Sequence, residues 1–306
     1  MPPLIGLIQL LAIGFGLYLL TLILYTMRGL TRPHRQTYAS AVARSLPGDP
    51  SELDTPLEYE SCTIKGTQGD IELWMLKGNH PDGPTLVMTH GWGSSRQGGL
   101  KRLEPFIERC SRIVIWDIPG HGDSGGHTRL GSQEHNDLAR VLDSIPGSES
   151  IVLFGWSMGA GVSLACADQY TGEHKAGDHT IIAIICESPY SIAITPARNV
   201  IRLRGVPHRL NLKPAIALLG IRFGIGPSWR GFDRTQIASR IKQPILILHG
   251  TEDPVSPIAD GRAITQSAPN ARLVEIEDAG HNNLWMDEEF RAQTIDAVEG
   301  FMDSLS

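Results

Sequence analysis

The residues best suited to do chemistry lie in Gly155-Trp156-Ser157-Met158-Gly159, a Gly-x-Ser-x-Gly motif. Four apolar residues, 151–154, precede the motif as a short buried strand would, and small helix-compatible residues follow it. A tight turn between strand and helix leaves its serine exposed at the helix N-terminus. Gly155 and Gly159 fit this interpretation because the strand and the helix nearly touch there, and a Cβ would clash. The motif therefore predicts Ser157 as a nucleophile.

A serine nucleophile needs a general base and an acid to orient that base. Among the 11 histidines, His281 lies just beyond the last expected strand, 272–276, and Asp253 lies beyond the strand before it, 244–248. The chain order Ser157, Asp253, His281 is the order of triads on α/β sheets. We expect His281 to take and return the serine proton while Asp253 fixes the imidazole tautomer. Glu252 stays open as an alternative acid.

The oxyanion formed during acyl transfer needs two N–H donors. The main-chain N–H of Met158 is one candidate, and that of Trp92, in the loop after the strand 85–89, is the other. We expect His90 to shape this loop, although it is also a possible base. The residues Asp117, His121 and Asp123 are expected to structure the loop after the next strand.

Several short apolar strands, separated by helical patterns, must bring these residues together. The expected strands are 57–65 and 71–76, which flank a turn and form an antiparallel hairpin, and then 85–89, 113–116, 151–154, 181–186, 244–248 and 272–276. Helices are expected around residues 100–110 and over 132–144, 258–267 and 286–304, and after the serine motif. Strands that are apolar on both faces predict a mostly parallel sheet covered on both sides, so the fold class is doubly wound α/β.

Two regions depart from this alternation. Residues 190–240 contain no clear strand and are rich in Ile, Leu, Pro and Arg, which predicts a small helical cap over the carboxyl ends of the strands. Residues 4–27 contain no charged side chain and are long enough to cross a membrane. We therefore expect a transmembrane anchor over 1–30, a linker over 31–56 and a catalytic domain over 57–306.

The anchor has competing interpretations. Arg28, Arg32 and Arg35 follow it, so the positive-inside rule predicts a single-pass protein with a cytoplasmic domain. A cleaved signal peptide, with Ala39-Ser40-Ala41 as the cleavage site, is the alternative, but the apolar stretch is long and lacks a basic leading region. A buried core helix fits less well because every face is apolar.

Composition narrows the classes of partner. The chain is 41% hydrophobic and 20% charged, with a net charge of −6, which describes a folded protein and argues against nucleic acid. The four cysteines, 62, 110, 166 and 186, have no metal-ligand spacing, so we expect free thiols and no metal site.

Five blocks together resemble the α/β-hydrolase superfamily: 90–93 (HGWG), 117–124 (DIPGHGDS), 155–159 (GWSMG), 249–257 (HGTEDPVSP) and 280–281 (GH). They are most similar to the branch of monoacylglycerol lipases, lysophospholipases and membrane-tethered acyl-protein thioesterases. The resemblance implies an eight-stranded sheet and no cofactor. Serine, rather than aspartate, at the nucleophile position argues against dehalogenases and epoxide hydrolases.

We therefore expect a membrane-anchored serine hydrolase that cleaves carboxylic esters or thioesters of lipid-like acyl substrates. An aminopeptidase-like activity on the same triad is one alternative, and a non-catalytic membrane-tethered binding domain is another. Fold alone does not decide among these functions.

Overall fold

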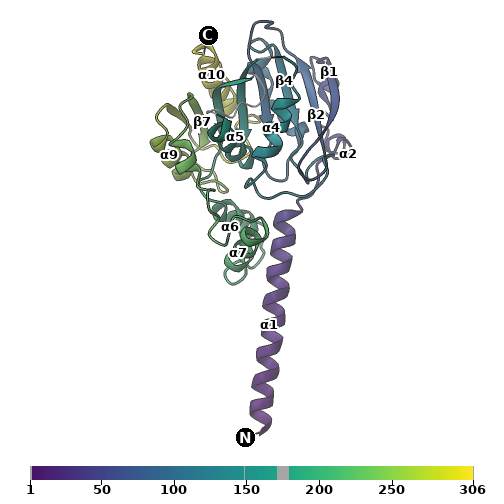
Figure 1. Cartoon of the computed structure of the whole chain (residues 1–306), viewed down its shortest axis with the longest axis vertical. Helices are drawn as coiled ribbons and strands as arrows, with labels where there is room; N and C mark the ends of the chain where they lie inside the picture. The colour runs from purple at the N-terminus through teal and green to yellow at the C-terminus, as the bar shows by residue number, and fades with distance from the viewer. Residues whose placement is uncertain (1, 148, 171–178, 306) are drawn as a thin grey trace.

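The computed structural model describes residues 2–147, 149–170 and 179–305. A rounded domain carries one long helix, α1 (Pro2–Thr31), which projects away from it (Figure 1). In the described residues α1 is the one helix long and apolar enough to cross a membrane, and residues 4–18 are exposed throughout.

Within the described residues, eight strands form one sheet in the order β1-β2-β4-β3-β5-β6-β7-β8. The first two strands pair antiparallel with each other, β2 also pairs antiparallel with β4, and all other pairs are parallel. The strands are β1 (Tyr59–Lys65), β2 (Asp70–Lys77), β3 (Thr85–Thr89), β4 (Arg112–Trp116), β5 (Ser150–Trp156), β6 (Thr180–Glu187), β7 (Ile245–Gly250) and β8 (Ala271–Ile276). The predicted doubly wound, mostly parallel sheet and its opening hairpin are confirmed.

Helices cover both faces of this sheet. The remaining elements are α2 (Tyr38–Val42), η1 (Pro50–Glu52), η2 (Arg96–Arg102), α3 (Glu104–Ile107), α4 (His135–Asp143), α5 (Met158–Tyr170), α6 (Ile194–Leu203), α7 (Leu212–Arg222), α8 (Arg234–Ala238), α9 (Ile258–Ser267) and α10 (Glu288–Asp303). Side chains of β5 alternate between two cores: Ile151 and Leu153 pack with α4 and α5, while Val152 and Phe154 pack with α3 and α10. A strand buried on both faces has to be apolar throughout, as the sequence pattern indicates.

The helix expected around residues 100–110 is instead two shorter elements, the 3₁₀ helix η2 and the single turn α3. Pro105 lies in the first turn of α3, where its missing N–H costs nothing, but it cannot continue a helix from η2.

The segment 31–56, which we expect to be a linker, packs against the domain. The Arg35 guanidinium donates to the carbonyls of Gly122 and Ser124 at 2.9 and 2.6 Å. The Gln36 side-chain amide donates to the Gly93 carbonyl at 2.7 Å, and Ala41 in α2 is buried. The sequence pattern misses these contacts because all of them are with distant residues.

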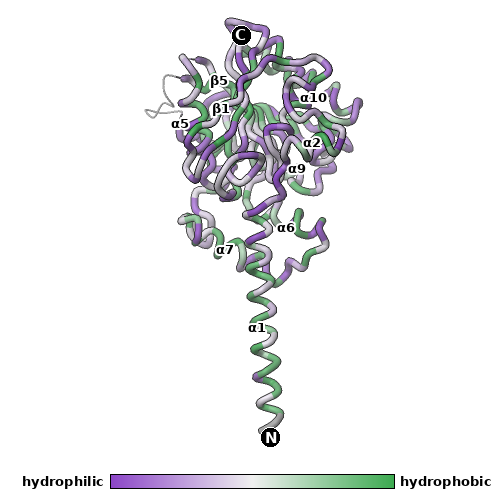
Figure 2. The backbone as a smooth tube through the Cα atoms, turned by 90° about the vertical axis from the view of Figure 1, so that its right-hand side faces the viewer, coloured by the Kyte–Doolittle hydropathy of each residue, from purple (hydrophilic) through white to green (hydrophobic). Residues whose placement is uncertain are grey.

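The predicted cap corresponds to α6 and α7, which lie beside the domain end of α1 (Figures 1 and 2). Helix α8, which lies within the predicted cap region 190–240, packs on α5 and α9 instead. Its Arg234 is buried and donates to the Gly131 carbonyl, so this turn belongs to the layer over the sheet.

Candidate active site

Ser157 occupies the turn between β5 and α5 with a positive φ of 53°, a backbone conformation that is strained for a residue with a side chain. Its N–H donates to the Glu187 carbonyl at 2.8 Å, which ties the turn to the end of β6. A Cβ on Gly155 would lie 2.3 Å from the Gly159 carbonyl oxygen, and one on Gly159 would lie 1.9 Å from that of Thr89. Gly155 is therefore required by the close approach of β5 to the helix that follows, as the motif predicts, and Gly159 by the approach of that helix to the end of β3.

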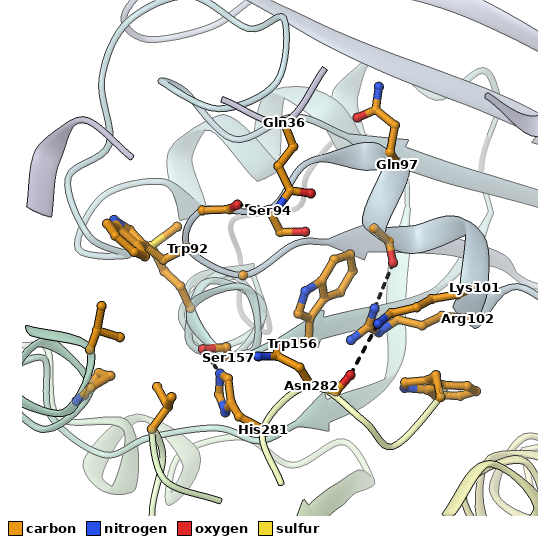
Figure 3. Close-up of a pocket in the computed structure, with 18 of the residues that line it drawn as sticks. Gln36, Trp92, Ser94, Gln97, Lys101, Arg102, Trp156, Ser157, His281 and Asn282 are labelled. Carbon is orange, nitrogen blue, oxygen red and sulfur yellow. Dashed lines mark hydrogen bonds between the residues drawn. The ribbon is translucent and has the colours of Figure 1, made fainter. Parts of the chain in front are cut away.

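His281, in the loop after β8, contacts both Ser157 and Asp253. Its Nε2 lies 3.0 Å from Ser157 Oγ, and its Nδ1 lies 2.7 Å from Asp253 Oδ2. Figure 3 shows the imidazole directed at the serine hydroxyl. With Nδ1–H donating to the carboxylate, Nε2 keeps a lone pair that can accept the serine proton.

The carboxylate of Asp253 is fixed on both of its oxygens. Oδ1 accepts the main-chain N–H groups of Val255 and Ser256, each at 2.8 Å, while Oδ2 faces His281. Burial acts to raise the pKa of Asp253, but the hydrogen bond and charge of His281 and the two N–H donors outweigh it, so that pKa lies below its ordinary value. The alternative acid, Glu252, is exposed. The geometry therefore favours Asp253 over Glu252 as the partner of His281.

The loop after β3 approaches the serine closely. A Cβ on Gly91 would lie 3.2 Å from Ser157 Cβ, so only glycine allows this approach without a shift. Trp92 follows, and it lines the same cavity as Ser157 and Met158. Met158 is the first residue of α5, and main-chain N–H groups in a first helical turn have no partner within the helix. Both predicted oxyanion donors thus come from segments that border Ser157.

The indole of Trp92 connects three parts of the chain. Its Nε1–H donates at 2.8 Å to the carbonyl of Leu30, in the last turn of α1, and the guanidinium of Arg204, at the end of α6, lies 4.8 Å from the ring centre. The helix α1, the cap and the loop beside the serine therefore meet at one side chain.

His90 has both ring nitrogens engaged by the main chain. Its Nε2 accepts the Ile118 N–H at 2.9 Å, and Nδ1 lies 2.8 Å from the Gly91 carbonyl. Burial lowers the pKa of His90 to about 4, so it stays neutral at physiological pH. The ring therefore shapes two loops, which is the role expected for it, and leaves no nitrogen free to act as a base.

The loop after β4 is organised by a buried ion pair. Asp117 accepts from the Arg96 guanidinium and main-chain N–H, both at 2.6 Å, and from the Asp123 N–H at 3.0 Å. Asp117 and Asp123 thus structure this loop, as expected.

A second buried ion pair lies beneath the serine turn. The Arg102 guanidinium binds both carboxylate oxygens of Glu187, at 2.7 and 2.5 Å, and Trp285 Nε1–H donates to the same carboxylate at 2.8 Å. Arg102 also lies 4.2 Å from the Trp156 ring centre. Sequence patterns do not single out Arg102, Glu187 or Trp285, since each is ordinary in its local sequence.

Ser157 and His281 open into a cavity of about 910 Å³ whose lining is mostly apolar. This volume is near the upper end of the roughly 300–1,000 Å³ range of small-molecule sites. Three groups of side chains that sequence patterns do not single out form its walls: Leu30 of α1, Ala41 of α2 and Leu46 of the loop after α2; Ala197, Val200 and Leu203 of α6; and Trp156, Trp285 and Met286 around the triad. Figure 3 shows Gln36, Trp92 and Ser94 on one side of the cavity and Lys101, Arg102 and Asn282 on another.

Within the part of the chain that the structure describes, no group of three or more His, Cys, Asp or Glu side chains could hold a metal ion. The four cysteines are free, and Cys110, Cys166 and Cys186 are buried.

Comparison with curated proteins finds esterases and a lipase. A pimeloyl-[acyl-carrier protein] methyl ester esterase of Aromatoleum aromaticum is 24% identical over 65% of this chain and 91% of its own length. A lysophosphatidylserine lipase of Rattus norvegicus is 28% identical over 68% of this chain, which spans 51% of that lipase. These relatives support a hydrolase.

Comparison with solved structures agrees on the fold. An esterase of Pyrococcus furiosus superposes with a TM-score of 0.65 at 21% identity, over 90% of this chain and 98% of that one. The family described as "Alpha/beta hydrolase family" matches residues 86–297, which include Ser157, Asp253 and His281. With the fold, the motif blocks and this match in agreement, the chain belongs to the alpha/beta hydrolase family.

Proposed function

We propose that this protein is a membrane-anchored serine hydrolase that cleaves carboxylic esters or thioesters of acyl substrates. The observation that carries the proposal is the continuous hydrogen-bonded path from Asp253 through His281 to Ser157, at the edge of a mostly apolar cavity. The two relatives described above act, by their names, on an acyl methyl ester and on a lysophospholipid, which supports an acyl ester as the substrate class.

In the proposed mechanism, Ser157 Oγ attacks the substrate carbonyl while His281 Nε2 takes the hydroxyl proton. The N–H groups of Met158 and Trp92 stabilise the oxyanion, and the N-terminal end of α5 adds a favourable dipole. Collapse of the intermediate breaks the bond to the alcohol or thiol, which receives the proton from His281 and leaves an acyl-enzyme. Water then attacks the acyl-enzyme with His281 as base, which releases the acid and restores Ser157. Asp253 stabilises the imidazolium in both steps.

Two features support a lipid-like acyl group. Most of the surface that lines the cavity is apolar, which favours an alkyl chain for the part of the substrate that lies against it. The helix α1 is long and apolar enough to keep the domain beside a bilayer, where such substrates reside.

The test is turnover of a p-nitrophenyl ester series, from acetate to palmitate, by the full chain in detergent. The full chain is needed because Leu30 lines the cavity and Arg35 binds the domain. Ser157→Ala should abolish turnover and fluorophosphonate labelling, while Ser163→Ala, a buried serine of the same helix α5, should keep both. The serine mechanism would be refuted if Ser157→Ala still hydrolysed the esters, or if the wild-type protein neither hydrolysed any ester nor reacted with the fluorophosphonate.

The orientation of the anchor has a separate test. Because Arg28, Arg32 and Arg35 follow residues 4–27, we expect a cytoplasmic domain. Protease added outside intact cells should spare the domain, and its digestion there would reverse the assignment.

A further inference from the structure

The basic residues of this chain are unevenly distributed. Residues 188–232, which include α6 and α7, contain seven Arg or Lys and no Asp or Glu, although the whole chain has a net charge of −6. All seven are exposed, and none forms an ion pair with another described residue: Arg198, Arg202, Arg204, Arg209, Lys213, Arg222 and Arg230. A cluster of unpaired cations on an acidic protein indicates a surface that attracts anions.

Large apolar side chains are exposed on the same segment. Leu203, Leu210 and Ile221 are 62%, 61% and 58% exposed, and they alternate along the chain with the basic residues. Basic side chains interleaved with exposed leucine and isoleucine are the composition of segments that lie at a membrane interface.

The cap is fixed at the point where α1 leaves the domain. Helix α7 packs against α1, and the buried Asn211 side chain donates to Thr26 Oγ1 at 2.6 Å. Residues 4–27 of a helix span about 36 Å, against about 30 Å for the hydrocarbon core of a bilayer. If α1 crosses the membrane, Thr26 lies at the level of the lipid headgroups, and so does the cap beside it (Figures 1 and 2).

We propose that the surface formed by α6, α7 and the loop between them, residues 194–222, rests on anionic phospholipid headgroups. The arginines and the lysine bind headgroup phosphates, and Leu203, Leu210 and Ile221 enter the apolar boundary beneath them. The proposal deepens the proposed function and rests on α1 spanning the membrane. Because Leu203 and Arg204 also line the catalytic cavity, this contact places the cavity wall against the lipid that supplies the substrate.

The experiment uses the full chain in vesicles of phosphatidylcholine with or without phosphatidylglycerol. An environment-sensitive fluorophore is attached at Leu210→Cys in a Cys62→Ser background, since the other three cysteines are buried. Phosphatidylglycerol should shift the emission to shorter wavelength and protect the probe from aqueous iodide, and high salt should reverse both effects. An alkaline wash of the vesicles reports the insertion of α1 in every sample.

Charge removal supplies the matched comparison. Each basic residue near an anionic membrane strengthens binding about fivefold. Arg202→Gln, Arg209→Gln and Lys213→Gln together should therefore lower the equilibrium constant for the cap–lipid contact by about 100-fold. Lys77→Gln, Lys242→Gln and Arg272→Gln remove the same charge from exposed positions near the amino ends of the parallel strands, and they should change nothing. Turnover of a short soluble ester should be unchanged in both triple variants.

Each result bears on the proposal. If the chain inserts but the probe reports the same environment in neutral and anionic vesicles, the cap proposal is wrong and the anchor stands. An equal response in both triple variants would show non-specific attraction and would also overturn it. If the alkaline wash releases the chain from the vesicles, α1 is not inserted, and both the anchor and the cap proposal are wrong. The esterase assay would still test the catalytic function.

Discussion

Substitution of Glu187 by Gln should destabilise the protein while leaving its chemistry nearly intact. The Glu187 carboxylate and the Arg102 guanidinium are 1% and 2% exposed, and they form two parallel hydrogen bonds. Glutamine keeps the shape of the side chain but removes its charge, so the Arg102 cation remains buried without a counter-ion. Removing one partner of a buried pair costs about 3–5 kcal/mol in free energy of unfolding.

The effect on catalysis should be small because the contact with the serine turn is a main-chain one. The Ser157 N–H donates to the Glu187 carbonyl oxygen, which the substitution keeps. Turnover per folded molecule should therefore stay within about tenfold of wild type, a difference of no more than about 1.4 kcal/mol in the activation barrier. Stability and activity should separate in this variant.

The assay is urea unfolding of the full chain in a non-ionic detergent, with ester turnover measured below the transition. The double variant Arg102→Met with Glu187→Leu removes both charges. It should be more stable than Glu187→Gln, because apolar replacement of a buried ion pair is often neutral. A loss below about 1 kcal/mol for Glu187→Gln would refute the reasoning on burial. Near-complete loss of turnover at unchanged stability would instead assign Glu187 to the chemistry.

Three further predictions follow from the site. Gly159→Ala puts a Cβ 1.9 Å from the Thr89 carbonyl oxygen and should cost more than about 2 kcal/mol of stability, measured by thermal unfolding. Gly300→Ala, on α10 with open space around it, should stabilise the protein by about 0.5–1 kcal/mol. The pKa of His90 is depressed to about 4 in the fold, so the unfolded chain binds more protons below its unfolded pKa of about 6.5. The contribution of neutral His90 to the free energy of unfolding is therefore complete above about pH 6.5 and is lost as the pH falls. The loss should be about 2 kcal/mol between about pH 7.5 and pH 5. Urea titrations of His90→Gln should show a smaller loss over the same range. Ala41→Phe places a bulky ring in the cavity and should lower turnover of long esters relative to acetate by about tenfold or more. The control Ala39→Phe, at an exposed position of the same helix, should not. Equal effects of the two substitutions would place the acyl group elsewhere.

The sequence determines those features of this protein that depend on neighbouring residues. Apolar strands and helical spacing specify the α/β fold class, because burial on both faces of a sheet requires such strands. The serine turn is partly local, since Gly155 is needed where β5 and the next helix meet so closely, whereas the need for Gly159 comes from the distant Thr89 carbonyl at the end of β3. Chain order and strand ends also point to Asp253 and His281 before any contact is known.

Only the tertiary structure decides which distant residues meet. His281 and Ser157 are 124 positions apart, Arg102 and Glu187 are 85 apart, and Trp92 and Leu30 are 62 apart. No periodic pattern encodes such pairs, because they depend on how layers pack and on which side chain has the length to reach a partner. For the same reason residues 31–56 look like a linker in the sequence but form part of the cavity wall in the fold.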